Sequence, residues 1–193
     1  MASADDYVSL VHENPAAALA ELRRDRSLAG SAASWGETAM QAASHLGHQR
    51  LLAGLVDAGA VPDIFAACAM GDMAAIEALL PYSRPDVLGV HRLPLLHFAI
   101  VSRDPSILDM LLDAGITLNP RGASLSPLHS AVAVGSVPMI RALVEAGVDR
   151  TVTDAFGATA LDWAYDVEDK GSILAVVLAG YLRRATEDLP TAG

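Results

Sequence analysis

The sequence predicts an all-α protein, a solenoid in which short helix pairs stack in a row and are joined by short or missing β-hairpin loops. Two apolar runs share one pattern: PLLHFAIVSRDPSILDMLLDAGIT begins at residue 94 and SPLHSAVAVGSVPMIRALVEAGVD begins 32 residues later, at 126. A pattern that returns at such a period indicates a stacked repeat, because each unit buries its apolar faces against its neighbours. The alanine-rich composition, with only 5% aromatic residues, favours helices packed closely through small side chains.

The unit boundaries follow from six equivalent residues, small or polar, each of which ends the first helix of a unit. These residues are Asn14, Gly47, Gly71, Arg103, Gly135 and Glu168, at intervals of 33, 24, 32, 32 and 33 residues. Each unit is expected to contain a helix, a short turn, a second helix and a glycine stop. The chain is therefore predicted to be one domain, 1–193, with units at about 5–34, 38–61, 62–93, 94–125, 126–158 and 159–185.

Proline and glycine mark the helix ends in order along the chain. Pro127 and Pro138 lie in first turns, where a missing N–H costs little. Gly59, Gly115 and Gly147 each follow a second helix, where a left-handed residue is favoured. The 24-residue interval leaves no room for a hairpin near residues 60–63, so a direct turn is expected there.

The units resemble the ankyrin repeat, in a bacterial type with about six degenerate copies. The matches to the family pattern T-P-L-H-x-A-A-x-x-G-H are Ser126-Pro127-Leu128-His129 with Ala131 and Gly135, Leu96-His97 with Ala99, Thr159-Ala160-Leu161-Asp162 with Ala164, and Thr38 through Ala43 to Gly47-His48. The first unit lacks the pattern and the sixth has Glu168-Asp169 in place of Gly-His, as is common in terminal repeats. The resemblance implies an interaction scaffold without catalysis.

Composition bears on location and partners. The formal net charge of −10 disfavours a nucleic-acid partner, because an acidic surface repels phosphates. Cys68 is the only cysteine, so neither a disulfide framework nor a thiolate zinc site is expected. No secretory signal and no apolar run of about 18 residues is present, which predicts a cytoplasmic protein without a membrane span. Abundant alanine and a single lysine, Lys170, suggest a bacterial source with a GC-rich genome.

The resemblance also implies a concave face, lined by the residue after the motif, the two positions before the closing glycine and the hairpin tips. Most of these positions are apolar here, and a contiguous apolar strip usually marks a binding surface. Burial by tighter helix packing, or by a homodimer contact, is the alternative. The predicted ligand-binding residues are Trp35, Leu46, Met70, His91, Phe98, Val101, Ser102, Ser130, Val134, Phe156, Trp163 and Val167. Phe98, Trp163, Met70, Val101 and Val134 are expected to form one continuous floor.

Histidines divide into two groups. His48, His97 and His129 hold motif positions, for which the resemblance implies a structural role. His12 and His45 hold equivalent groove positions on adjacent units, so they are expected to lie about 8–10 Å apart, the usual spacing of packed helices. No enzyme motif and no metal-ligand spacing is recognisable, so neither a metal nor a cofactor is expected.

Two functions from different classes remain open at this point. In the first, the chain is a binding module whose apolar groove receives a hydrophobic protein segment or ligand. In the second, it is a cofactor-independent enzyme that carries out dehydration, conjugate addition or cyclisation on a hydrophobic small molecule. The acid–base residues in that case would be His12, Glu13, His45 and Asp166.

Overall fold

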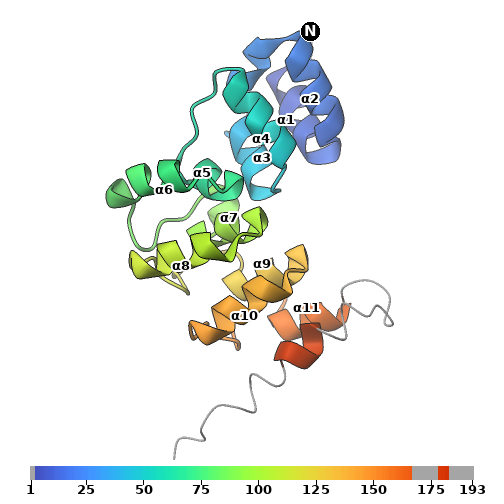
Figure 1. The fold of residues 1–193 in the computed structure, drawn as a ribbon. Coiled ribbons are helices and arrows are strands. Elements are labelled where there is room, and N and C mark those ends of the chain that lie inside the picture. Colours follow the sequence, from blue (N-terminus) through green and yellow to red (C-terminus); the bar gives the residue numbers. More distant parts are fainter. Residues whose placement is uncertain (1–2, 167–177, 183–193) are drawn as a thin grey trace, which may run out of the picture.

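A computed structural model describes residues 3–166 and 178–182, and these residues form a row of stacked helix pairs (Figure 1). The pairs are α1 (Ala4–Glu13) with α2 (Pro15–Arg24), α3 (Ala39–His45) with α4 (Gln49–Asp57), α5 (Ile64–Met70) with α6 (Met73–Leu79), α7 (Leu95–Ser102) with α8 (Pro105–Asp113), and α9 (Pro127–Val134) with α10 (Val137–Glu145), followed by α11 (Ala160–Asp166). Short 3₁₀ helices cover Arg26–Gly30, Leu80–Tyr82 and Val90–Arg92. Within the described residues there are helices and isolated bridges but no strands, which confirms the all-α prediction.

Side-chain caps define where the helices begin. Thr38 and Gln41 form a reciprocal capping box at the start of α3, and the Ser126 hydroxyl accepts a hydrogen bond from the backbone of His129 in α9. A cap of this kind stabilises a helix by about 1 kcal/mol, because it satisfies an N–H that has no partner within the helix. At the other end of α9, Gly135 adopts the left-handed conformation, with φ 69°, and ends the helix.

The core lies between the first helices of successive pairs and between the two helices of each pair. Helices α1, α3, α5, α7, α9 and α11 pack side by side in what we call the inner row, and α2, α4, α6, α8 and α10 form the outer row. The predicted ladder of small residues lies within the inner row and is fully buried, at Ala43, Ala67, Ala99, Ala131 and Ala164. A methyl group at each step allows the helices to approach closely, so the ladder sets the spacing of the stack.

The connection from α4 to α5 is shorter than the loops that precede α3, α7, α9 and α11. Three loops contain a single antiparallel bridge, Ala32–Thr38, Leu88–Pro94 and Thr153–Thr159. The connection from α4 to α5 has no such bridge and runs directly to Asp63, which caps α5. The prediction of a missing hairpin near residues 60–63 is therefore confirmed.

The end of α3 touches α7, although α5 lies between them in the row. His97 on α7 donates its Nε2–H to the backbone carbonyl of His45, at 2.8 Å. A Cβ atom placed on Gly47 would lie 3.0 Å from Cβ of Val101, and Gly47 has φ 68°. The backbone of α3 therefore approaches α7 so closely that only glycine fits at this point.

No helix among the described residues has both the length and the apolar character needed to cross a membrane.

Substitution of one alanine of the inner-row ladder tests whether these helices pack as closely as described. Ala131→Leu places three extra carbon atoms between fully buried helices and is expected to lower the free energy of unfolding by about 1–3 kcal/mol. Ala133 lies two residues further along α9 and is exposed, so Ala133→Leu is expected to cost far less. Urea denaturation midpoints of the two variants check this expectation. Equal losses would contradict the helical phase described here.

Candidate functional site

A buried carboxylate, Glu37, lies at the centre of the candidate site. Glu37 stands in the loop before α3, directly before the capping residue Thr38, and is only 4% exposed. Its backbone carbonyl closes the loop by accepting the N–H of Ala33, as the carbonyl of Leu93 accepts the N–H of Gly89. Glu37 therefore occupies the register position that a buried leucine, Leu93, occupies in a later loop.

Four side chains converge on this carboxylate. Trp35 donates its Nε1–H to Oε2 at 3.1 Å, and His12 Nε2 lies 3.1 Å from the same oxygen. Two other histidines approach Oε1, with His45 Nε2 at 3.2 Å and His91 Nε2 at 3.3 Å. We call these five residues the Glu37 cluster. Three imidazoles around one carboxylate form a site that can exchange protons or hold a cation.

The inner row positions two of the histidines. His12 lies one residue before the end of α1, and His45 is the last residue of α3. Their ring centroids are 5.2 Å apart, which is closer than the spacing of about 8–10 Å expected for packed helix axes, because the two side chains lean toward each other over Glu37.

The loop between α6 and α7 supplies the third histidine. His91 adopts a left-handed conformation with φ 55°, and Arg92 follows with φ 57°. This conformation is uncommon for residues other than glycine, and such outliers gather at functional sites. Arg92 donates its Nε–H to the carbonyl of Gly122 and so ties this loop to the next. The loop before α7 thereby brings His91 Nε2 to 3.3 Å from Glu37 Oε1.

Second contacts fix the position of His45. The His97 Nε2–H bond to the His45 carbonyl leaves His97 Nδ1 as an acceptor, and the Ser130 hydroxyl donates to it at 2.9 Å. Burial lowers the pKa of His97, so its ring is neutral, as this chain of hydrogen bonds requires. Ser130 is itself buried in α9. The site is therefore connected through α7 to the far half of the row.

Glu37 and His45 have opposite responses to burial. Burial alone would raise the pKa of Glu37, but hydrogen bonds from Trp35 and His12 outweigh it and hold that pKa below its usual value. For His45, burial lowers the pKa to about 4 against the attraction of Glu37, and the neighbouring histidines His91 and His12 lower it further. At neutral pH the site therefore contains a carboxylate beside an uncharged imidazole.

His45 Nε2 has an unusual environment. It is buried and 3.2 Å from Glu37 Oε1, yet the direction of approach is not that of a hydrogen bond, and no other partner satisfies it. Of the described residues that could hold a metal ion, His12, Glu37 and His45 form the group whose ligand atoms all lie within 4.8 Å of one another.

Comparison with known proteins identifies the repeat. Residues 111–164 match a family model described as ankyrin repeats (many copies). The match to ankyrin repeats covers this part of the chain, from the end of α8 into α11. A stretch of 97 residues, 47% of this chain, is 32% identical to the palmitoyltransferase AKR1 of Lachancea kluyveri, and it spans only 13% of that protein. The Glu37 cluster lies outside residues 111–164, in the earlier part of the chain.

The ankyrin register correctly indicates the neighbourhood of His12 and His45, but it gives no sign of Glu37. In the sequence Glu37 is one acidic residue in a loop, where a solvated side chain is the usual case. The signal that could have found it is the equivalent position in later units, which is held by Leu93 and Leu125. A charge at a position that two leucines and one alanine, Ala158, hold in later units indicates a buried, paired carboxylate.

The structure corrects the predicted apolar floor at its central residue. Phe98 is 1% exposed, and its ring packs against Phe65 with centroids 4.9 Å apart. The same ring lies so close to Gly89 that a Cβ there would be 2.9 Å away. Helices α5 and α7 and the loop before α7 therefore enclose Phe98, and its ring is not available to a ligand on the surface.

Trp163 and the other residues predicted for the floor are partly covered. Trp163 packs edge-on against His129 of α9 and donates its Nε1–H to Asp154, in the loop before α11, at 2.9 Å. Met70, Val101 and Val134 are half-buried, and the Ser102 hydroxyl donates to the carbonyl of Ala99. The floor is thus a series of partly covered side chains rather than a continuous strip.

Large exposed side chains occur at both ends of the row. Trp35 and Leu46 are exposed beside the Glu37 cluster, and Phe156 is exposed on the loop before α11. Val167, also predicted as a ligand-binding residue, lies outside the described residues.

Two predicted acid–base residues are not part of the cluster. Glu13 is exposed at the end of α1, next to His12. Asp166 is exposed at the end of α11, in the last part of the row, while the cluster is built on α1 and α3 at its beginning (Figure 1).

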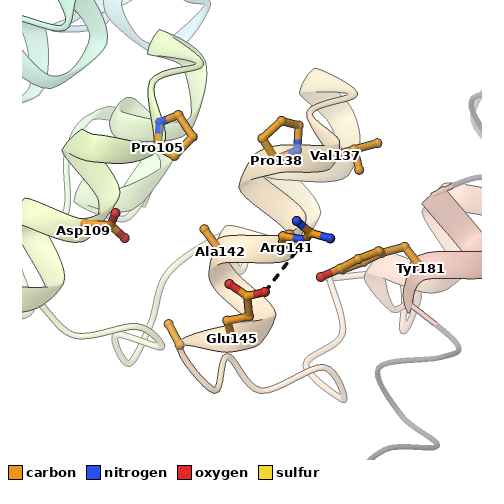
Figure 2. Close-up of a pocket in the computed structure, with 9 residues that line it drawn as sticks. Pro105, Asp109, Val137, Pro138, Arg141, Ala142, Glu145 and Tyr181 are labelled. Atoms are coloured by element: carbon orange, nitrogen blue, oxygen red, sulfur yellow. Dashed lines mark ion pairs between the residues drawn. The ribbon is translucent and has the colours of Figure 1, made fainter.

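Open hollows lie between outer-row helices. One has a volume of about 720 Å³ and is lined by α8, α10 and Tyr181, with an ion pair between Arg141 and Glu145 at 3.8 Å (Figure 2). Another of about 370 Å³ lies between α2 and α4. Because such hollows recur between outer helices, we attribute them to the stacking geometry rather than to a particular ligand.

The depressed pKa of His45 predicts a dependence of stability on pH. The unfolded chain protonates this histidine near pH 6.5, whereas the folded chain does so only near pH 4. Between these values the unfolded state binds the proton and the folded state does not, so stability falls as pH falls through this window, by up to about 1.4 kcal/mol per pH unit from this residue.

Urea denaturation midpoints between pH 7 and pH 4, in the presence of EDTA, measure this dependence. His45→Asn is expected to show a shallower loss than the parent protein. An unchanged slope would contradict the buried, neutral state of His45.

Proposed function

We propose that the chain is a binding protein of the ankyrin type, and that the inner-row surface at Trp35 and Leu46 anchors a hydrophobic segment of a partner protein. The observation that carries this proposal is the state of Trp35, which is 53% exposed while its Nε1–H is fixed on the buried carboxylate of Glu37. An indole that is half exposed and already oriented loses little freedom on binding, which favours a strong contact.

The loop that carries Trp35 is held in place before any partner arrives. The backbone N–H and the hydroxyl of Ser34 both donate to the Asp5 carboxylate, at 2.7 and 2.8 Å. Ankyrin repeats typically mediate protein binding, and this arrangement supplies a rigid aromatic anchor at one end of the row. The net charge of −10 favours a partner segment in which basic residues flank the apolar ones.

Peptide selection tests the proposed anchor. Peptides selected from a displayed random library on the wild-type protein are expected to combine apolar and basic residues. Trp35→Ala is expected to weaken their binding by about tenfold or more, because aromatic residues at such anchors contribute most of the binding energy.

The matched control is Tyr82→Ala, which removes an equally prominent aromatic side chain from the 3₁₀ helix after α6. This variant is expected to bind the selected peptides as the parent does. Circular dichroism establishes that both variants are folded. If Trp35→Ala binds like the parent, the anchor is not at Trp35 and the proposal fails.

Catalysis is the second candidate function, and the Glu37 cluster is the observation that favours it. A carboxylate shielded from water beside an uncharged imidazole is an arrangement suited to proton transfer in dehydration, conjugate addition or cyclisation of a hydrophobic molecule. The residues that would act are His12, Glu37 and His45. No cofactor is needed for these reactions.

Mass spectrometry of the purified protein incubated with unsaturated hydrophobic carbonyl compounds tests this candidate. Turnover is expected to be lost in Glu37→Gln, because its amide cannot accept a proton, while binding of the compound is retained. Trp35→Ala is expected to raise KM more than it lowers kcat. Turnover that persists in Glu37→Gln would exclude a catalytic role for the cluster.

A further inference from the structure

We infer that His12, Glu37 and His45 form a binding site for a divalent first-row transition cation of the Zn²⁺ type. This inference goes beyond the proposed function, because the cation would bind whether or not a partner is present. Two imidazole nitrogens and one carboxylate are a ligand set that occurs in zinc and non-haem iron sites that keep open positions.

The separations between the ligand atoms fit a shared cation. His12 Nε2 lies 3.1 Å from Glu37 Oε2, His45 Nε2 lies 3.2 Å from Oε1, and all three groups have ligand atoms within 4.8 Å of one another. Ligands held about 2.0–2.1 Å from a tetrahedral cation lie roughly 3.3–3.4 Å from each other. Both His–Glu separations are close to this value, and no pair of ligand atoms is more than 4.8 Å apart.

The orientation of the His45 ring distinguishes a cation site from a cluster held together only by hydrogen bonds. Its Nε2 is buried and close to Oε1, yet it does not point at that oxygen and has no hydrogen-bond partner. A buried polar atom without a partner is costly, and few persist in folded proteins. When two ligand atoms bind the same cation, both point at the cation and not at each other. His45 Nε2 and Glu37 Oε1 have the relative position expected for such a pair.

Contacts behind the ligands resemble the supports of metal sites. Trp35 donates to Glu37 Oε2 and orients the carboxylate, and His97 donates to the backbone carbonyl of His45 and holds the end of α3 in place. His91, which is half exposed and 3.3 Å from Oε1, can supply a fourth nitrogen from the surface side. Because His12 and His91 are partly exposed, a cation can enter from solvent.

The ligand chemistry selects the class of cation. Imidazole nitrogens favour zinc, iron, cobalt and nickel, whereas magnesium and calcium prefer oxygen ligands throughout. The ligands come from α1, α3 and two loops, so they are scattered from residue 12 to residue 91. This scatter explains why the sequence shows no metal-ligand spacing and why no metal was expected from it.

Titration calorimetry on tag-free protein treated with EDTA tests the site. Zn²⁺ is expected to bind with one ion per chain and to raise the melting temperature, and Co²⁺ is expected to give the visible absorption of a tetrahedral site. His12→Asn, His45→Asn and Glu37→Gln are each expected to weaken Zn²⁺ binding by more than about tenfold, since loss of even an outer contact costs about 10–100-fold. Mg²⁺ is expected not to bind.

The matched control is His48→Asn. His48 follows α3 closely and also has a buried Nε2 without a hydrogen-bond partner, but it is not part of the cluster. This variant is expected to bind Zn²⁺ as the parent does. The inference is overturned if Zn²⁺ does not bind, if binding is equal in the parent and the three ligand variants, or if His48→Asn loses it. Peptide binding at Trp35 is measured separately without Zn²⁺, so either proposal can fail without the other.

Discussion

The buried carboxylate of Glu37 is the constraint on which the first half of the structure depends. A charge removed from water must be compensated by hydrogen bonds or by opposite charge, and Glu37 obtains hydrogen bonds from His12 on α1, from Trp35 in its own loop and from His91 in the loop before α7. Three segments that are remote in sequence are thereby held at one point. Loss of that carboxylate would leave Trp35 and three histidines without their common partner.

The stacking of the helices and the position of the site have different origins. The stack depends on a methyl group at each step of the inner row, such as Ala99 and Ala131, and it is uniform along the chain. The site depends instead on single residues, such as Glu37 and His91, that the repeat pattern does not specify. A regular stack thus carries local chemistry at positions outside its repeat.

The sequence was sufficient for the helices because their determinants are local. The caps and the glycine stops each act within a few residues of a helix end, and the repeat period shows where along the chain they recur. The site was only partly predictable, because the position of His91 depends on a left-handed loop that reaches across a neighbouring unit. Phe98 was placed on the surface because the family register assumes an open face, whereas here α5, α7 and the loop before α7 enclose its ring.

The contact between α3 and α7 changes how the stack holds together. In a regular solenoid each unit interacts only with its nearest neighbours, so stability is close to a sum of independent links and the ends can unfold alone. Here His97 binds the backbone of His45, and Gly47 lies against Val101, across the intervening α5. We therefore expect the segment from α3 to α7 to open as one cooperative unit, so that a destabilising change at either end destabilises the whole segment.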